Sequence, residues 1–276
     1  MIIQKEKGVS VKFMSKRMVT SAVLIAIGIL AVIFYPVCGI TVVLLTLIAL
    51  YEFFYMVEKK GVRLFKPLGI IVGAFIPISI YFKLKMGEGW QFLFIVVGLF
   101  LLFLLELTKK EKHQPILSIS ATIFGIMYIS WCSSFLIRIR QLPNGVWLLG
   151  FLLLVTKSSD IGAYIWGMRF GRTYLAKRVS PKKSLEGAVG GFLTAVAFGL
   201  ALSFFVQGLF LWEKIFLIIT IPIIAQLGDL FESLIKRDCK VKDSGKIMPG
   251  MGGVLDVIDS IIFTAPIFYL YLTMVK

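Results

Sequence analysis

Runs of about 18–22 mostly apolar residues recur along the whole chain, separated by short polar segments. At about 1.5 Å per residue, each run is long enough as a helix to cross a hydrocarbon layer about 30 Å thick. The chain is 58% hydrophobic and has a mean hydropathy of +0.92, which is more apolar surface than a water-soluble protein of 276 residues can bury. We therefore predict an all-α, polytopic integral membrane protein with about nine transmembrane helices. The predicted spans are 18–36, 38–57, 66–82, 90–107, 116–137, 146–168, 187–210, 212–235 and 253–275.

The basic residues predict the orientation in the membrane. With the N-terminus on the cytoplasmic side, the inner segments hold 23 of the 30 Lys and Arg residues, the outer segments hold six, and Lys157 lies within a span. This asymmetry follows the positive-inside rule and accounts for the net charge of +15 without a nucleic-acid partner. We predict a multi-pass protein of the inner (plasma) membrane with a cytoplasmic N-terminus. The first run is longer than a signal-peptide core, so we interpret it as a retained helix.

The distribution of polar residues divides the chain in two. Before about residue 150 they lie almost only in loops, with Glu52 and Glu106 close to helix ends where they can reach the interface. From residue 157 onward, charged and small polar residues enter predicted spans, where they are costly unless they face protein, water or an ion. We predict a transmembrane scaffold over residues 1–150. Residues 151–276 are predicted to form a catalytic transmembrane region with cytoplasmic polar loops.

The few cysteine and histidine residues limit the metal ligands and catalytic groups that the chain can supply. The three cysteines are isolated and have no metal-finger spacing, so neither a disulfide framework nor a zinc site is indicated. The only histidine, His113, lies in a Lys-rich inner loop, where a solvated surface residue is expected. This disfavours a mechanism that needs a histidine base or ligand.

Two polar groups come first along the catalytic region. Lys157 and Asp160 lie three residues apart in the sixth predicted span, where they form either an internal ion pair or part of a polar cavity. The segment 180–187, Ser-Pro-Lys-Lys-Ser-Leu-Glu-Gly, is either an ordinary positive-inside loop or a polyphosphate site. Lysines beside hydroxyls and glycine suit a polyphosphate. Gly187 then opens a helix whose free N–H groups favour an anion.

The third group, at the end of the eighth predicted span, is the most specific. Asp229, Glu232, Ser233 and Lys236 recur at three- and four-residue steps and therefore share one helix face. Two carboxylates on one face near the membrane surface indicate a cation site. The Pro-Gly-Met-Gly-Gly turn at 249–253 follows and cannot form a regular helix. Its glycines would let backbone amides approach a ligand.

Two more acids, Asp256 and Asp259, share a face in the first turns of the last helix. The structural alternative is that they stabilise the helix dipole. Four carboxylates beside a Lys-rich, Gly-rich loop instead favour a magnesium-bound nucleotide or diphosphate, because magnesium prefers hard oxygen ligands.

These residues resemble the phosphatidate cytidylyltransferases, also called CDP-diacylglycerol synthases. The family signature joins a serine, a Lys-Arg pair, a Lys-Asp pair, a Pro-Gly-His-Gly-Gly turn and Leu-Asp-Arg-x-Asp-Ser. The matching residues are Ser233, Lys236-Arg237, Lys242-Asp243, Pro249-Gly250, Gly252-Gly253, Leu255-Asp256 and Asp259-Ser260. The segments 180–187 and 160–164 are also similar to the family, whereas before residue 150 the resemblance rests on hydropathy alone. Two positions depart from the signature, with Met251 in place of the histidine and Val257 in place of the arginine.

The resemblance implies transfer of a cytidylyl group from CTP to phosphatidic acid, giving CDP-diacylglycerol and pyrophosphate. It implies CTP, phosphatidic acid and membrane lipids as partners and Mg²⁺ as cofactor, and it is compatible with a second metal ion and a homodimer. We expect Asp229 and Asp256 to bind magnesium, with Glu232 and Asp259 supporting them or binding a second ion. The expected catalytic residues are Asp229, Asp256, Lys183 and Lys236. The expected substrate-binding residues are Lys182, Lys183, Ser184, Lys236, Arg237, Lys242, Gly252, Gly253 and Asp160.

The same residues are compatible with two other functions. One is a CTP-dependent enzyme that acts on another lipid phosphate, which only a comparison of acceptors would distinguish. The other is an ion-coupled transporter, because intramembrane acids such as Asp160 and Asp229 can mark an ion path. A transporter leaves the glycine turn and its lysines unexplained.

Overall fold

The chain is built almost entirely from helices. A computed structural model describes residues 2–83, 88–108 and 114–274, so the prediction for His113 lies outside the described residues. The helices are α1 Ile2–Ile33, α2 Tyr35–Lys59, α3 Lys66–Tyr81, α4 Glu88–Leu107, α5 Pro115–Gly125, η1 Ile126–Trp131, α6 Cys132–Gln141, α7 Gly145–Phe170, α8 Leu185–Ser203, α9 Leu211–Asp238 and α10 Leu255–Met274. Strands β1 Tyr174–Ala176 and β2 Ser180–Ser184 pair antiparallel between α7 and α8. The predicted helical class is confirmed, and this small hairpin is an addition to it.

Six helical segments in the described ranges are long and apolar enough to cross a membrane. They are Tyr35–Lys59, Pro115–Gln141, Gly145–Phe170, Leu185–Ser203, Leu211–Asp238 and Leu255–Met274. Shorter apolar helical stretches at Arg17–Ile33, Lys66–Tyr81 and Val96–Leu107 overlap the three other predicted spans. The chain is therefore a multi-pass helical membrane protein, and the total of nine spans stays a prediction.

Local sequence explains where several helices begin and end. A proline lies in the first turn of α2, α3 and α5, where its missing N–H is not needed. The predicted kink residue Pro77 lies inside α3, which continues past it. The seventh span was predicted to reach residue 210, but α8 ends at Ser203. A loop follows in which Gly208 has a φ of +80°. This left-handed conformation is incompatible with a right-handed helix.

The predicted span 116–137 forms three consecutive helical pieces. The π-helical segment η1 joins α5 to α6. Single π-helical turns are rare and occur frequently at functional sites, because the extra residue per turn redirects the side chains. This turn carries Tyr128, whose place is described below.

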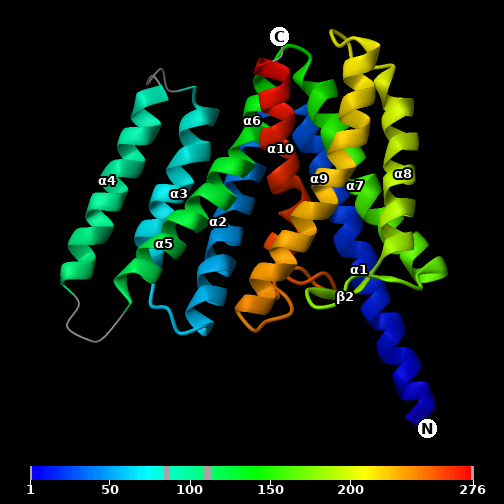
Figure 1. The fold of residues 1–276 in the computed structure, drawn as a ribbon, viewed down its shortest axis with the longest axis horizontal. Helices are drawn as coiled ribbons and strands as arrows, with labels where there is room; N and C mark the ends of the chain where they lie inside the picture. The colour runs from blue at the N-terminus through cyan, green and yellow to red at the C-terminus, as the bar shows by residue number, and fades with distance from the viewer. Residues whose placement is uncertain (1, 84–87, 109–113, 275–276) are drawn as a thin grey trace.

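The basic loops lie together at one end of the bundle. Figure 1 shows the α2–α3 connection, the β-hairpin and the α9–α10 loop at the same end as the N-terminus, whereas the C-terminus lies at the opposite end. This grouping is the one that the charge distribution predicts. Which end faces the cytoplasm stays a prediction.

Two buried apolar clusters connect the first and second halves of the chain. One contains Ile137 of α6, Phe151 of α7 and Phe268 of α10. The other contains Leu50 of α2 and Leu255 of α10. The predicted scaffold therefore packs directly against the predicted catalytic region, and the division at residue 150 stays a prediction from sequence alone.

Candidate active site

Acids from two helices meet at the end of the bundle that carries the basic loops. Asp229 and Glu232 come from α9 and Asp259 comes from α10, and each offers a carboxylate oxygen within 4.8 Å of the other two. Glu232 is 0% exposed and Asp259 is 6% exposed. Among the described residues, Oε1 of Glu232 has no hydrogen-bond partner. We call these three residues the acid cluster, and it concentrates negative charge in a largely buried space.

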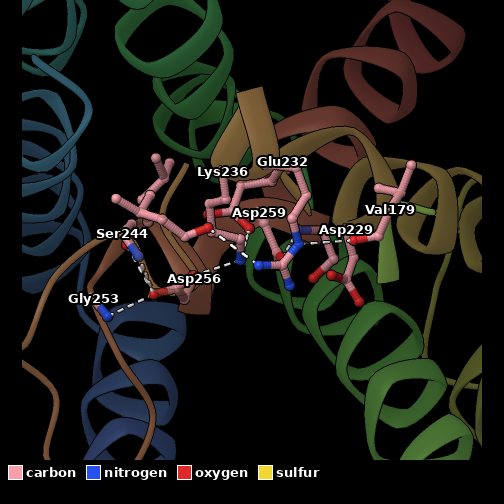
Figure 2. A network of polar contacts seen from close by, with 12 residues as sticks. Val179, Asp229, Glu232, Lys236, Ser244, Gly253, Asp256 and Asp259 are labelled. Atoms are coloured by element: carbon pink, nitrogen blue, oxygen red, sulfur yellow. Dashed lines mark hydrogen bonds and ion pairs between the residues drawn. The ribbon is translucent and has the colours of Figure 1, made fainter. Parts of the chain in front are cut away.

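Lys236 joins the fourth acid, Asp256, to the acid cluster. Its Nζ contacts Oε2 of Glu232, one turn earlier on α9, and lies 2.6 Å from Oδ1 of Asp256. Figure 2 shows this arrangement, with Asp256 on one side of Lys236 and Asp229 on the other side of Glu232. All three members of the contact are largely buried, so each charge depends on the others for compensation. Asp256 is thus adjacent to the acid cluster but does not share its central space.

The glycine turn holds Asp256 through its backbone. Gly250 and Gly252 have φ of +80° and +105°, which L side chains rarely adopt. Oδ2 of Asp256 accepts hydrogen bonds from the N–H of Gly253 at 2.7 Å and from the N–H and Oγ of Ser244 at 2.9 Å each. The prediction of a non-helical turn is confirmed. In this structure the N–H groups of Gly253, in the turn, and of Ser244, before it, bind the carboxylate of Asp256 at the start of α10.

The β-hairpin brings a lysine to the acid cluster. Nζ of Lys183 lies 2.5 Å from Oδ2 of Asp229. Arg237, near the end of α9, donates from Nε to the backbone oxygen of Val179 at 3.1 Å and so ties α9 to the hairpin. Two contacts with α9 therefore hold the hairpin next to the acid cluster.

The remaining predicted phosphate ligands lie around this region. Ser184 is the N-cap of α8, and its Oγ accepts a hydrogen bond from the N–H of Gly187 at 3.1 Å. The helix thus begins at Leu185, two residues before the predicted start. Lys182 and Lys242 are exposed, and their ammonium groups are open to a ligand that arrives from water.

Lys157 links α7 to α10 next to the acid cluster. Its Nζ donates to Oδ2 of Asp160 at 2.9 Å, to the backbone oxygen of Val257 at 2.8 Å and to Oγ of Ser260 at 3.0 Å. Ser260 also donates to Oδ2 of Asp160 at 2.9 Å. The structure shows the ion pair of Lys157 with Asp160, which is one of the two alternatives that the sequence left open. Val257, which stands in place of the family's arginine, contributes only its backbone oxygen here. This contact therefore does not depend on the side chain of Val257.

Two residues of the site were not predicted from sequence. Glu52 was expected at the membrane interface, and this is wrong: it is 3% exposed, and its Oε2 lies 3.1 Å from Oγ of Ser244 in the α9–α10 loop. Tyr128 of η1 has its ring 5.7 Å from the rings of Phe231 of α9 and Phe263 of α10. Its buried hydroxyl has no hydrogen-bond partner in the part of the chain that the structure describes. Both residues lie in apolar runs, and an acid inside such a run is the one signal that could have revealed Glu52.

Comparison with known proteins identifies the family of this chain. The sequence pattern of the cytidylyltransferase family matches residues 15–275. A phosphatidate cytidylyltransferase of Synechocystis sp. is 32% identical over 262 residues, covering 84% of this chain and 87% of that protein. Another from Bacillus subtilis is 28% identical over 263 residues, covering 94% and 98%. The uncharacterised protein YnbB of Escherichia coli is 39% identical over 151 residues, which are 55% of this chain and 50% of YnbB, so the match spans half the length of that relative. This chain therefore belongs to the cytidylyltransferase family, a family of nucleotidyltransferase enzymes.

Proposed function

We propose that this enzyme transfers the cytidylyl group of CTP to phosphatidic acid, giving CDP-diacylglycerol and pyrophosphate. The observation that carries the proposal is the acid cluster, in which oxygens of Asp229, Glu232 and Asp259 lie within 4.8 Å of one another. The cluster adjoins a lysine-bearing hairpin and a glycine turn, as expected for a site that binds phosphates with a metal ion. Two relatives named phosphatidate cytidylyltransferase support the choice of substrates.

The acid cluster fits magnesium by the chemistry of its donors. Carboxylate oxygens are hard ligands of the kind that magnesium binds. The buried Oε1 of Glu232 has no hydrogen-bond partner among the described residues, so this oxygen is free to accept an ion. Asp229, Glu232 and Asp259 would hold it, and Asp256 would join them only on release from Lys236. When bound, magnesium would supply positive charge that stabilises the charge developing on the phosphates.

Cations of the hairpin and the α9–α10 loop would receive the triphosphate. The side chain of Lys183 is 26% exposed at the edge of the acid cluster, so its ammonium group can exchange Asp229 for a phosphate oxygen. Lys182 of the hairpin and Lys242 of the α9–α10 loop are exposed. Both substrates are anions, and these cations would reduce the repulsion between the lipid phosphate and the nucleotide.

The reaction depends more on the alignment of the two substrates than on a general acid or base. A phosphate oxygen of phosphatidic acid attacks the α-phosphorus of CTP in line with the bond to the β-phosphate. A new P–O bond forms, the bond from the α-phosphorus to the bridging oxygen breaks, and pyrophosphate leaves with the electron pair. A phosphate monoester has a second pKa of about 6, so near pH 7 it is already largely dianionic and needs no general base. Replacement of the family histidine by Met251 is therefore compatible with this step.

The position of the site in the bundle suits one lipid and one water-soluble substrate. The cluster lies near the ends of α9 and α10, which are apolar enough to cross the membrane. The acyl chains of phosphatidic acid would remain among the lipids while its headgroup enters the polar region, and CTP would arrive from water. By the positive-inside rule, we place this end of the bundle on the cytoplasmic side of the inner membrane.

The test is a reconstituted reaction with purified, detergent-solubilised protein and CTP labelled at the α-phosphate. Labelled liponucleotide should appear only when phosphatidic acid and magnesium are both present. Asp229→Asn should lower product formation by at least about 100-fold. Glu58→Gln is the matched control, because Glu58 pairs with Lys66 at 2.5 Å on the α2–α3 side.

Parallel reactions with a prenyl phosphate and with an ether-lipid phosphate separate the proposed acceptor from its alternatives. Product with one of these and none with phosphatidic acid would assign another lipid substrate. Folded wild-type protein that gives no liponucleotide with any acceptor would overturn the proposal.

A further inference from the structure

We infer that Glu52 of α2 is a positioning residue for the nucleotide site, acting on Asp256 through Ser244 and the glycine turn. The inference rests on the proposed function and adds to it a residue from the first half of the chain. Glu52 is 3% exposed, and its Oε1 has no hydrogen-bond partner within the described ranges. A buried carboxylate is costly, so its retention at this place calls for a structural or functional reason.

Glu52 holds two segments that meet at the site. Its Oε2 accepts a hydrogen bond from the N–H of Leu255 at 3.0 Å. Leu255 is the first residue of α10, so Glu52 provides an acid at the N-terminus of this helix from a different helix. The same Oε2 lies 3.1 Å from Oγ of Ser244, in the α9–α10 loop. Glu52 thus fixes the loop relative to the start of α10.

Ser244 connects Glu52 to Asp256. Its Oγ lies 2.9 Å from Oδ2 of Asp256 and 3.1 Å from Oε2 of Glu52. The hydroxyl has one hydrogen and donates to one of these carboxylates at a time. The N–H of Ser244 donates to Asp256 at 2.9 Å throughout. A displacement of Glu52 therefore reaches Asp256 through a single intervening residue.

Two glycines make the space that Glu52 occupies. A Cβ atom at Gly245 would collide with Oε1 of Glu52, and a Cβ atom at Gly253 would collide with Oε2 and with Oγ of Ser244. Neither glycine has a positive φ, so packing rather than backbone conformation requires them. Gly245, which precedes the turn, and Gly253, its last residue, thus leave room for a side chain from α2.

The first experiment measures steady-state kinetics of Glu52→Gln and Glu52→Asp, with Glu58→Gln as control on the same helix. Glutamine keeps the shape but places an amide where the carboxylate lies, and aspartate withdraws the carboxylate by one methylene. Loss of a partner that orients a functional residue costs about 10–100-fold at metal centres, and we expect kcat/KM for CTP to fall by a factor of this size in both variants. The fall should come mainly from a higher KM for CTP, while the KM for phosphatidic acid changes less than about twofold.

This split separates positioning from loss of folded protein. A smaller folded fraction lowers the apparent kcat and leaves both KM values unchanged. If Glu52 acts through Ser244, then Glu52→Gln combined with Ser244→Ala should lose little more than the stronger single variant, because the two changes break one chain of contacts. The inference would be overturned if the losses of the two single variants multiplied in the double variant. It would also be overturned if the KM for CTP stayed at the wild-type value in both Glu52 variants.

A measurement without substrates separates this inference from the proposed function. Backbone hydrogen exchange of a peptide covering residues 244–255 should be faster in Glu52→Gln than in wild type, and unchanged in Glu58→Gln. Wild-type protein without cytidylyltransferase activity would overturn the proposed function, and faster exchange would still support the hold of Glu52 on the turn. Unchanged hydrogen exchange of this peptide in Glu52→Gln would show that Glu52 does not fix the turn.

Discussion

The substitution Lys236→Met keeps most of the apolar stem of the side chain but removes the charge between Glu232 and Asp256. Asp256 would retain the hydrogen bonds from Gly253 and Ser244. Glu232 is fully buried, and neither of its carboxylate oxygens has a hydrogen bond within the described residues. The loss of the lysine charge therefore destabilises Glu232 more than Asp256. Removing one partner of a buried ion pair costs about 3–5 kcal/mol. At about 2–4 °C per kcal/mol for a protein of roughly this size, we expect Tm to fall by about 6–20 °C.

The assay is thermal unfolding in detergent, followed by tryptophan fluorescence at one scan rate for all variants. The double variant Glu232→Gln with Lys236→Met removes both charges, and it should recover at least about half of the loss, because replacing both members of a buried pair is often close to neutral. A Tm for Lys236→Met within about 2 °C of wild type, or no recovery in the double variant, would refute the reasoning.

Three further predictions follow from the same region. Asp229→Asn should lower the cytidylyltransferase rate by at least about 100-fold at saturating CTP and raise the magnesium concentration needed for half-maximal rate, which a magnesium titration measures. Gly253→Ala, whose Cβ would collide with Glu52 and Ser244, should lower both Tm and activity, whereas Gly28→Ala, with open space around it, should change neither. Burial raises the pKa of the Cys239 thiol, so less thiolate is present at neutral pH. In a chain whose other two cysteines are replaced by alanine, maleimide should therefore label folded protein more slowly than urea-unfolded protein at pH 7, and equal rates would contradict this.

The parts of the site that follow from local spacing were predictable. Asp229 and Glu232 share a face of α9 because helical periodicity is a property of a few consecutive residues. The same reasoning placed Asp256 and Asp259 near them and expected Asp256 to bind magnesium together with Asp229, whereas in the structure Asp259 joins the acid cluster. Which of the two acids joins it depends on the rotation of α10 about its axis. Burial of Leu255 and Ile258 sets this rotation, and packing across the whole bundle decides it.

Contacts between distant segments could not be predicted from one sequence. The partner of Glu52 lies 192 residues away, and no local pattern connects the two. The β-hairpin has strands of three and five residues, too short for the alternation that marks a strand. The total of nine spans was inferred from hydropathy, and three of the nine correspond to shorter apolar helical stretches in the structure.

The long separation between Glu52 and Ser244 sets an order for biogenesis. During co-translational insertion, α2 enters the bilayer well before the ribosome has made the segment that contains Ser244 and Leu255. Until that segment arrives, the nascent bundle carries an uncompensated acid, which is costly in lipid. The carboxylate of Glu52 therefore gains its hydrogen-bond partners only when the segment before the final helix and the start of that helix have been made.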